Sequence, residues 1–193
     1  MGVDRQAALT AVRERLSAES AAHSERVAVM AKRIAEAYAL DAEEAYLGGL
    51  LHDWARDMSG EDLLREARLL GLPVTEADER VPYLLHAPVG ARLLRREFPG
   101  LSESVLESIA THTCGAPQMS ELAMAVFVAD SIEPGRTHAS ASVLRAAVGA
   151  LPLRELFVRT YADGLRHLVE TRRPMHPQTL KTWNWIADGG AFS

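Results

Sequence analysis

Apolar residues recur every three or four positions along most of this sequence, and the alternating runs of β-branched residues that are typical of strands are missing. Side chains three or four positions apart share one face of an α-helix, whereas strands require a period of two. Val27, Met30, Ile34 and Tyr38 illustrate the helical spacing. The sequence therefore predicts an all-α fold, a bundle of about eight to ten helices.

Pro, Gly and Ser residues separate the expected helices, and Ser20, Asp41, Ser59 and Ser102 are the expected N-caps. We predict helices over roughly 4–16, 20–38, 41–53, 87–98 and 120–131, one each from Ser59 and Ser102, and two or three more between 140 and 187. Residues 73–85 are expected to form a loop with short turns. We expect a single domain over 1–193, with a core over about 20–135 and the C-terminal helices of about 140–187 packed on it.

Composition narrows the function classes. The chain has 193 residues, and 21 Lys and Arg against 26 Asp and Glu give a net charge of −5, which argues against a general nucleic-acid binder. The one cysteine, Cys114, forms no intrachain disulfide and indicates a reducing compartment. No apolar run approaches the roughly 20 residues that a membrane span needs. We expect a cytoplasmic protein.

Residues with metal-ligand chemistry lie on or beside apolar helix faces. His23 precedes Val27 by one helical turn, and Asp130 follows Val126 by one. Burying an ionised carboxylate without a partner costs several kcal/mol or more, so we expect a positive charge beside the buried carboxylates. The six candidate metal ligands are His23, His52, Asp53, His86, His112 and Asp130.

Each candidate has a structural alternative when it is taken alone. A single histidine on an apolar face is usually a hydrogen-bonded core residue, and we read His138 and His167 that way. Asp53 could pair with Arg56, and Asp130 could be a buried cap. The six together favour a metal site, one that holds two ions.

The pattern resembles the HD-domain superfamily of metal-dependent phosphohydrolases, and more specifically its YqeK family, the HD-type symmetrical bis(5'-nucleosyl)-tetraphosphatases. The similarity spans about residues 20 to 180. Two positions differ from the usual pattern, Arg56 where lysine is common and Cys114 where threonine is usual. The matching segments are His23-Ser24-Glu25-Arg26-Val27, Gly49-Leu50-Leu51-His52-Asp53-Trp54-Ala55-Arg56-Asp57, His86-Ala87-Pro88-Val89-Gly90-Ala91, His112-Thr113-Cys114-Gly115, Val128-Ala129-Asp130-Ser131-Ile132-Glu133-Pro134-Gly135-Arg136 and Arg173-Pro174-Met175-His176-Pro177-Gln178-Thr179.

The resemblance implies a single HD domain with two metal ions. Its ligand sets would be His23, His52, Asp53 and Asp130 for one ion, and Asp53, His86 and His112 for the other, with Asp53 bridging. Mixed imidazole and carboxylate ligation suits borderline divalent ions. The family resemblance implies two divalent or trivalent ions and favours iron, with manganese, cobalt or magnesium as alternatives.

Further roles follow from side-chain chemistry near these ligands. Arginine binds phosphate as a fork, which makes Arg26, Arg56 and Arg136 the candidate phosphate contacts, with Arg56 and Arg136 also candidate catalytic residues beside Asp53. Asp57 could orient His52 or Arg56, and Trp54 is read as core rather than as a platform for adenine. Thr113 and His176 complete the candidate substrate contacts, with packing ranked first for His176.

The implied activity is symmetrical hydrolysis of diadenosine tetraphosphate (Ap4A) and related dinucleoside polyphosphates by a metal-activated water. Two alternatives stay open: a nucleotidase of the HD type acting on a mononucleotide or dNTP, and a non-catalytic nucleotide-binding module. The expected partner is a small-molecule nucleotide rather than a nucleic acid or a membrane, and a homodimer is compatible with the sequence.

Overall fold

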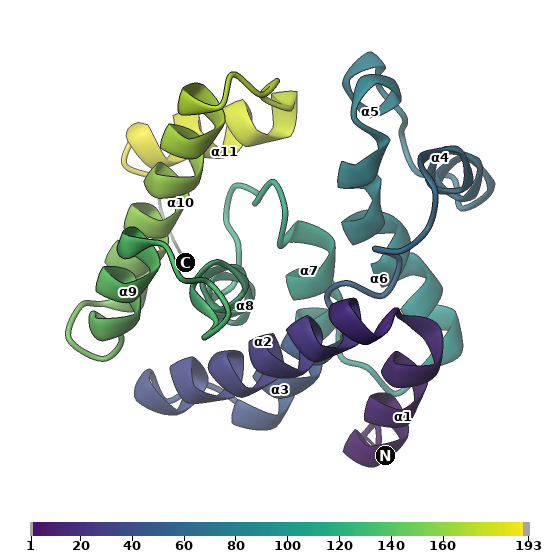
Figure 1. The fold of residues 1–193 in the computed structure, drawn as a ribbon, viewed down its shortest axis with the longest axis horizontal. Helices are drawn as coiled ribbons and strands as arrows, with labels where there is room; N and C mark the ends of the chain where they lie inside the picture. The colour runs from purple at the N-terminus through teal and green to yellow at the C-terminus, as the bar shows by residue number, and fades with distance from the viewer. Residues whose placement is uncertain (1, 191–193) are drawn as a thin grey trace.

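The computed structural model describes residues 2–190, and this part of the chain folds into eleven α-helices and one short 3₁₀ helix without a β-strand (Figure 1). The all-α prediction is therefore confirmed. The bounds are α1 (Arg5–Arg15), α2 (Ala18–Ala37), α3 (Ala42–Leu51), α4 (Gly60–Leu69), α5 (Glu76–Arg80), η1 (Pro82–Leu85), α6 (His86–Glu97), α7 (Glu103–Thr111), α8 (Glu121–Ile132), α9 (Ala139–Ala146), α10 (Leu153–Glu170) and α11 (Pro177–Ala187).

The N-caps account for most of the helix starts. The side chains of Asp41, Ser59 and Ser102 accept hydrogen bonds from backbone N–H groups in the first turn of α3, α4 and α7, as the sequence predicted. The expected cap of α2 was wrong. Ser17 caps this helix by accepting from the backbone N–H of Ser20, so α2 begins earlier, and Ser20 is buried inside its first turn.

The stretch 73–85 is more regular than the expected loop. It contains the five-residue helix α5 and the 3₁₀ helix η1. Thr75 and Asp78 form a capping box, in which each side chain accepts the other's backbone N–H, and this holds α5 in place. This short helix brings the described residues to eleven helices, one above the expected range. Its five residues are too few for a periodic apolar pattern.

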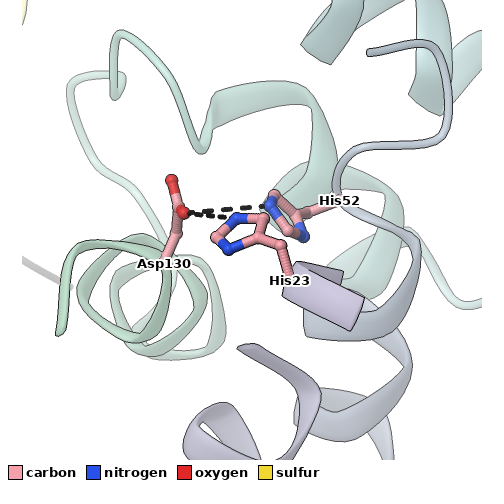
Figure 2. A group of neighbouring side chains, drawn as sticks. All are labelled: His23, His52 and Asp130. Carbon is pink, nitrogen blue, oxygen red and sulfur yellow. Dashed lines mark ion pairs between the residues drawn. The ribbon is translucent and has the colours of Figure 1, made fainter. Parts of the chain in front are cut away.

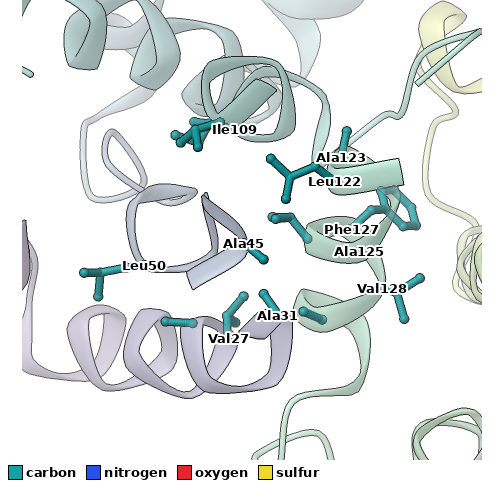
Figure 3. Packing of buried hydrophobic residues seen from close by; sticks show 14 of the residues in the cluster. Val27, Ala31, Ala45, Leu50, Ile109, Leu122, Ala123, Ala125, Phe127 and Val128 are labelled. Carbon is teal, nitrogen blue, oxygen red and sulfur yellow. The ribbon is translucent and has the colours of Figure 1, made fainter. Parts of the chain in front are cut away.

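Small residues let the central helices α2, α3 and α8 approach one another closely (Figure 3). A Cβ atom at Gly48 would lie 2.6 Å from Ser108 Oγ, and one at Gly49 would lie 2.9 Å from the Cα of Ala28. A side chain at Gly49 would meet the α2 backbone and force that helix away, whereas one at Gly48 would crowd the side chains of Ser108 on α7 and Val126 on α8. Val27, Ala31 and Ala45 fill the same contact. This packing fixes the position of the residues that follow α3.

The C-terminal helices cover one side of α8, whereas α4, α5 and α6 lie on the other side (Figure 1). The ring of Phe127 on α8 packs against Phe157 and Tyr161 of α10, with ring centroids 5.3 and 5.4 Å apart. The Tyr161 hydroxyl lies within hydrogen-bond distance of the carbonyls of Cys114 and Thr179, at 2.7 and 3.0 Å. Tyr161 thereby ties α10 to α11 and to the segment after α7. The boundary at about residue 135 and the extent over 1–193, whose ends lie outside the described residues, stay predictions.

Trp54 belongs to the core. Its side chain is 3% exposed, and its ring packs edge-to-face on Phe98 while the Arg15 guanidinium lies over it. In the part of the chain that the structure describes, no helix combines the length and apolar character needed to cross a bilayer.

Candidate metal centre and substrate cleft

The six predicted ligands converge at one point from five helices. Helix ends do most of the positioning: His52 and Asp53 directly follow α3, His86 is the first residue of α6, and His112 directly follows α7. His23 lies in α2, and Asp130 lies one half-turn before the end of α8. His52 and Asp53 are fully buried, and the other three histidines are less than 9% exposed.

Asp53 lies at the centre of the cluster, with one carboxylate oxygen on each side. Its Oδ2 is 3.6 Å from His23 Nε2 and 3.2 Å from His52 Nε2. Its Oδ1 is 3.1 Å from His86 Nε2 and 3.6 Å from His112 Nε2. One carboxylate thus faces two separate pairs of imidazoles.

Asp130 completes the first of these two groups. Its Oδ1 lies 3.0 Å from His23 Nε2 and 3.9 Å from His52 Nε2, and both rings turn a nitrogen toward this oxygen (Figure 2). In the second group the Nε2 atoms of His86 and His112 are 3.0 Å apart. Ligand atoms of His23, His52 and Asp130, and those of His52, Asp53 and His112, lie within 4.8 Å of one another.

Main-chain carbonyls orient three of the four imidazoles. The Nδ1 atoms of His52, His86 and His112 lie 2.7, 2.6 and 2.8 Å from carbonyl oxygens of Gly49, Tyr83 and Ile109, in each case three residues earlier in the chain. A carbonyl oxygen only accepts, so each Nδ1 carries the proton and donates. The Nε2 atom of each ring therefore points into the cluster.

Glu133 orients the fourth imidazole, and sequence reasoning did not single it out. Its carboxylate is 2% exposed, lies 3.2 Å from His23 Nδ1, and accepts from Arg26 Nε at 2.7 Å and from the backbone N–H of Gly135 at 2.5 Å. Because the carboxylate accepts, His23 also donates through Nδ1. A Cβ at Gly135 would lie 2.8 Å from this carboxylate. The available signal was a carboxylate one helical turn after Asp130.

Several polar atoms inside the cluster are unsatisfied. His23 Nε2, His52 Nε2 and Asp53 Oδ1 are buried and have no hydrogen-bond partner. Buried polar atoms of this kind require an explanation, and a cation between the imidazole nitrogens and the carboxylate oxygens provides one. Imidazole nitrogens and carboxylate oxygens are the ligands of borderline divalent metals. The residues present fit a metal centre.

Charge coupling within the protein agrees with a cation site. Burial lowers the pKa of His52, but the charges of Asp53 and Asp130 outweigh burial and raise it to about 8. Burial opposes ionisation of Asp53, yet the surrounding imidazoles hold its pKa well below the usual range, and the pKa of Asp130 is also lowered. Burial lowers the pKa of His112. The two carboxylates are thus held ionised.

The three predicted arginines have different surroundings. Arg56 Nη1 lies 2.6 Å from Asp53 Oδ2, and Arg136 Nη2 lies 2.9 Å from Asp130 Oδ1, so both guanidinium groups border the ligand carboxylates. Arg26 instead pairs with Glu133 and does not line the cleft beside the cluster. Its pairing with Glu133 gives it a structural role, and its phosphate contact stays a prediction.

A cavity of about 490 Å³ opens beside the cluster and is bordered by His86, His112 and Asp130. Four predicted substrate contacts line it, namely Arg56, Thr113, Arg136 and His176. His176 also caps α11 by accepting from the Gln178 N–H, and its Nε2 lies 3.1 Å from Asp78 Oδ1 on α5. His176 thus joins the two sides of the opening, in agreement with its expected packing role.

Asp57 does not orient His52 or Arg56. Its carboxylate accepts from the Ser17 N–H and the Ser20 hydroxyl, both at 2.7 Å. These bonds hold the start of α2 against the segment after α3. We expected Asp57 to orient His52 or Arg56, whereas its bonds to Ser17 and Ser20 indicate a structural role. His138 caps α9 and His167 lines the cleft, and both are exposed, so neither is the core residue that the sequence predicted.

Comparison with known proteins gives one consistent result. Residues 21–135 match the family model of the HD domain. A symmetrical bis(5'-nucleosyl)-tetraphosphatase of Bacillus subtilis is 29% identical over 187 residues, which cover 97% of this chain and 100% of the relative. One of Halalkalibacterium halodurans is 31% identical, covering 95% and 97% of the two chains.

A crystal structure from Clostridium acetobutylicum has the same fold. It is described as a predicted HD superfamily hydrolase involved in NAD metabolism, and it superposes with a TM-score of 0.89 at 28% sequence identity. The match covers 98% of this chain and 100% of that one.

Proposed function

The chain belongs to the HD domain family, and on that premise we propose that it is a metal-dependent phosphohydrolase that cleaves Ap4A and related dinucleoside polyphosphates symmetrically to nucleoside diphosphates. The relatives that match over nearly the full length carry the name of this activity. The observation that carries the proposal is Asp53, whose two oxygens face separate pairs of histidine nitrogens. This geometry supports a site for two ions.

The proposed ligand sets divide at Asp53. His23, His52 and Asp130 would hold one ion with Asp53 Oδ2, and His86 and His112 would hold the other with Asp53 Oδ1. Soft thiolates are not part of the set, and imidazole with carboxylate suits iron, manganese or cobalt. We propose iron, as the family resemblance implies.

When bound, two such ions lower the pKa of a water molecule and neutralise phosphoryl oxygens. The chain's own residues supply orientation and further positive charge. Arg56 and Arg136 border the two carboxylates and line the cavity, so each guanidinium can hold a non-bridging phosphate oxygen at the edge of the cluster. Phosphoryl transfer depends mainly on such positioning and charge neutralisation.

The leaving group needs little help from an acid. A nucleoside diphosphate leaves as a stabilised phosphate anion, unlike an alkoxide. Thr113, beside His112 on the cavity wall, offers a hydroxyl that donates to the phosphate chain. His176, which is bound to Asp78, serves in shaping the cavity.

Two alternatives to this substrate class remain. An HD nucleotidase acting on a mononucleotide or dNTP would use the same cluster with one nucleoside. A non-catalytic binding module would keep the cleft without needing six converging ligands, so the complete set speaks against it. We further propose a cytoplasmic location, and a homodimer stays a prediction.

The test combines elemental analysis with product identification on one anaerobically purified preparation. About two metal ions per chain and conversion of Ap4A to ADP alone support the proposal. Release of ATP and AMP would contradict symmetrical cleavage, and faster turnover of a dNTP would favour the nucleotidase. Fewer than about one ion per chain, with no hydrolysis after reconstitution, would favour the binding module.

A further inference from the structure

A second cavity adjoins the cleft beside the metal cluster. Its volume is about 650 Å³, and it lies between the α8–α9 region and α10. Both cavities fall in the range of roughly 300–1,000 Å³ that is typical of ligand sites. They share five lining residues, Asp130, Ser131, Arg136, Gly164 and His167. The shared wall thus includes a metal ligand and an arginine that borders it.

Gly164 is the unusual member of this wall. It lies in the interior of α10, where glycine is less favourable than alanine because it loses more backbone freedom on folding. Its φ angle is not in the left-handed region, and a Cβ built on it meets no atom within 4 Å. Neither backbone conformation nor protein packing therefore requires glycine here, in contrast to Gly48 and Gly49 in α3. The absence of a side chain at Gly164 leaves free space where the two cavities meet.

The second cavity carries charges of both signs. Arg136 lies at the end shared with the first cavity, whereas Asp163, Arg166 and Glu170 line the remainder, where Arg166 Nη1 pairs with Asp163 Oδ1 at 3.0 Å. Arg136 attracts phosphate, and the carboxylates away from it can accept from ribose hydroxyls or from an exocyclic amino group. This distribution suits a nucleoside whose phosphate chain leads back to the metal cluster.

A symmetrical substrate has its reacting bond in the middle and a nucleoside at each end. The metal cluster borders the place where the two cavities meet. Resting on the proposed function, we infer that each cavity takes one nucleoside half of a dinucleoside tetraphosphate and that Gly164 keeps the wall between them low enough for the phosphate chain to cross. Gly164 is then a specificity-determining residue for substrates with two nucleosides.

The test compares two substrates on Gly164→Ala and Gly164→Leu. Ap4A has two nucleosides, whereas adenosine 5'-tetraphosphate has one and can be held by a single cavity. We expect Gly164→Ala to raise Tm by stabilising α10 and yet to raise KM for Ap4A. Gly164→Leu should lower kcat/KM for Ap4A by about tenfold or more beyond its effect on adenosine tetraphosphate.

Val169→Ala provides the matched control. Val169 is 63% exposed on the same helix and lines neither cavity, so the substitution favours the helix without touching the cleft. Its kinetics on both substrates should equal those of the wild type. Equal losses on both substrates, or no loss with Gly164→Leu, would overturn the inference. If the wild type does not convert Ap4A to ADP, the proposed function fails instead, which separates the two outcomes.

Discussion

The two sides of the cleft are built in opposite ways. On the cluster side, His52 and Asp53 are fully buried, and every imidazole is anchored by an acceptor behind it. On the α10 and α11 side, Gly164, His167 and Arg173 are exposed. A ligand in the cleft therefore meets a buried, hydrogen-bonded cluster on one side and several exposed residues on the other.

This difference implies that the cluster side carries out the reaction, whereas the α10 side selects the substrate. Positioned charges accelerate phosphoryl transfer only if they are held in place before the substrate arrives, which burial and hydrogen bonding achieve. Exposed side chains tolerate substitution, so the α10 side can change its preferred substrate without disturbing the cluster. Substitutions on the two sides should consequently have effects of different kinds, in metal binding on one and in KM on the other.

Asp53→Ala should produce the largest effect, because both proposed ions lose a ligand. We expect turnover of Ap4A to fall by roughly three orders of magnitude or more. The metal content, measured by elemental analysis, should fall as well. Circular dichroism checks that the variant is folded. Near-normal turnover in a folded variant would rule out the proposed centre.

Glu133→Gln should weaken metal binding by about 10- to 100-fold, the usual loss when a residue that orients a ligand is changed. The amide cannot accept from His23, Arg26 and Gly135 together as the carboxylate does. Competition with a metal-binding dye measures the affinity. Arg26→Ala, which leaves the acceptor of His23 in place, should have the smaller effect, and the reverse order would contradict the role given to Glu133.

Arg136→Ala should lower kcat/KM by about tenfold or more because a charge-assisted phosphate contact is lost. Metal content should stay unchanged, since the ligands remain. Arg159→Ala, which removes an exposed pairing with Glu155 on α10, serves as the control and should leave kinetics unchanged. Loss of metal from the Arg136 variant would show that this guanidinium supports Asp130 rather than the substrate.

Asp57→Ala should have the smallest functional effect although Asp57 lies only four residues after Asp53. We expect about 1 kcal/mol of lost stability, the usual net contribution of a hydrogen bond, with metal content and kinetics unchanged. Chemical denaturation measures the stability. A change in kcat at full metal content would support the predicted role of Asp57 in orienting His52 or Arg56.

The same carboxylate predicts a dependence of stability on pH. Burial raises the pKa of Asp57, but the bonds from Ser17 and Ser20 outweigh it and leave the pKa below its usual value. A carboxyl with a lowered folded-state pKa stabilises the protein above its unfolded value, and the contribution is lost on acidification below about pH 4. The stability difference between wild type and Asp57→Ala should shrink there, and a constant difference would contradict it.

The sequence predicted local features well. Periodicity placed the helices, side-chain chemistry placed the caps at Asp41 and Ser59, and residue type with resemblance singled out six candidate ligands that lie together in the structure. Each of these depends on neighbours a few positions away or on a motif in fixed order.

What the sequence did not reveal depends on distant partners. Glu133 acts on His23 across 110 positions, and Asp57 bonds to Ser20 across 37. Ser20 resembles a cap until its hydroxyl is seen to bond elsewhere. The meaning of Gly164 emerges only when the fold places two cavities on either side of it. Such roles follow from tertiary packing and leave no periodic signal.

The carbonyl anchors of His52, His86 and His112 have a consequence for how this protein can diverge. A main-chain oxygen is present whatever residue occupies the position, so three of the four rings keep their orientation through sequence drift. His23 alone depends on a replaceable group, the carboxylate of Glu133. A single substitution at Glu133 can therefore change the orientation and basicity of the His23 imidazole, and with it one of the two proposed ligand sets.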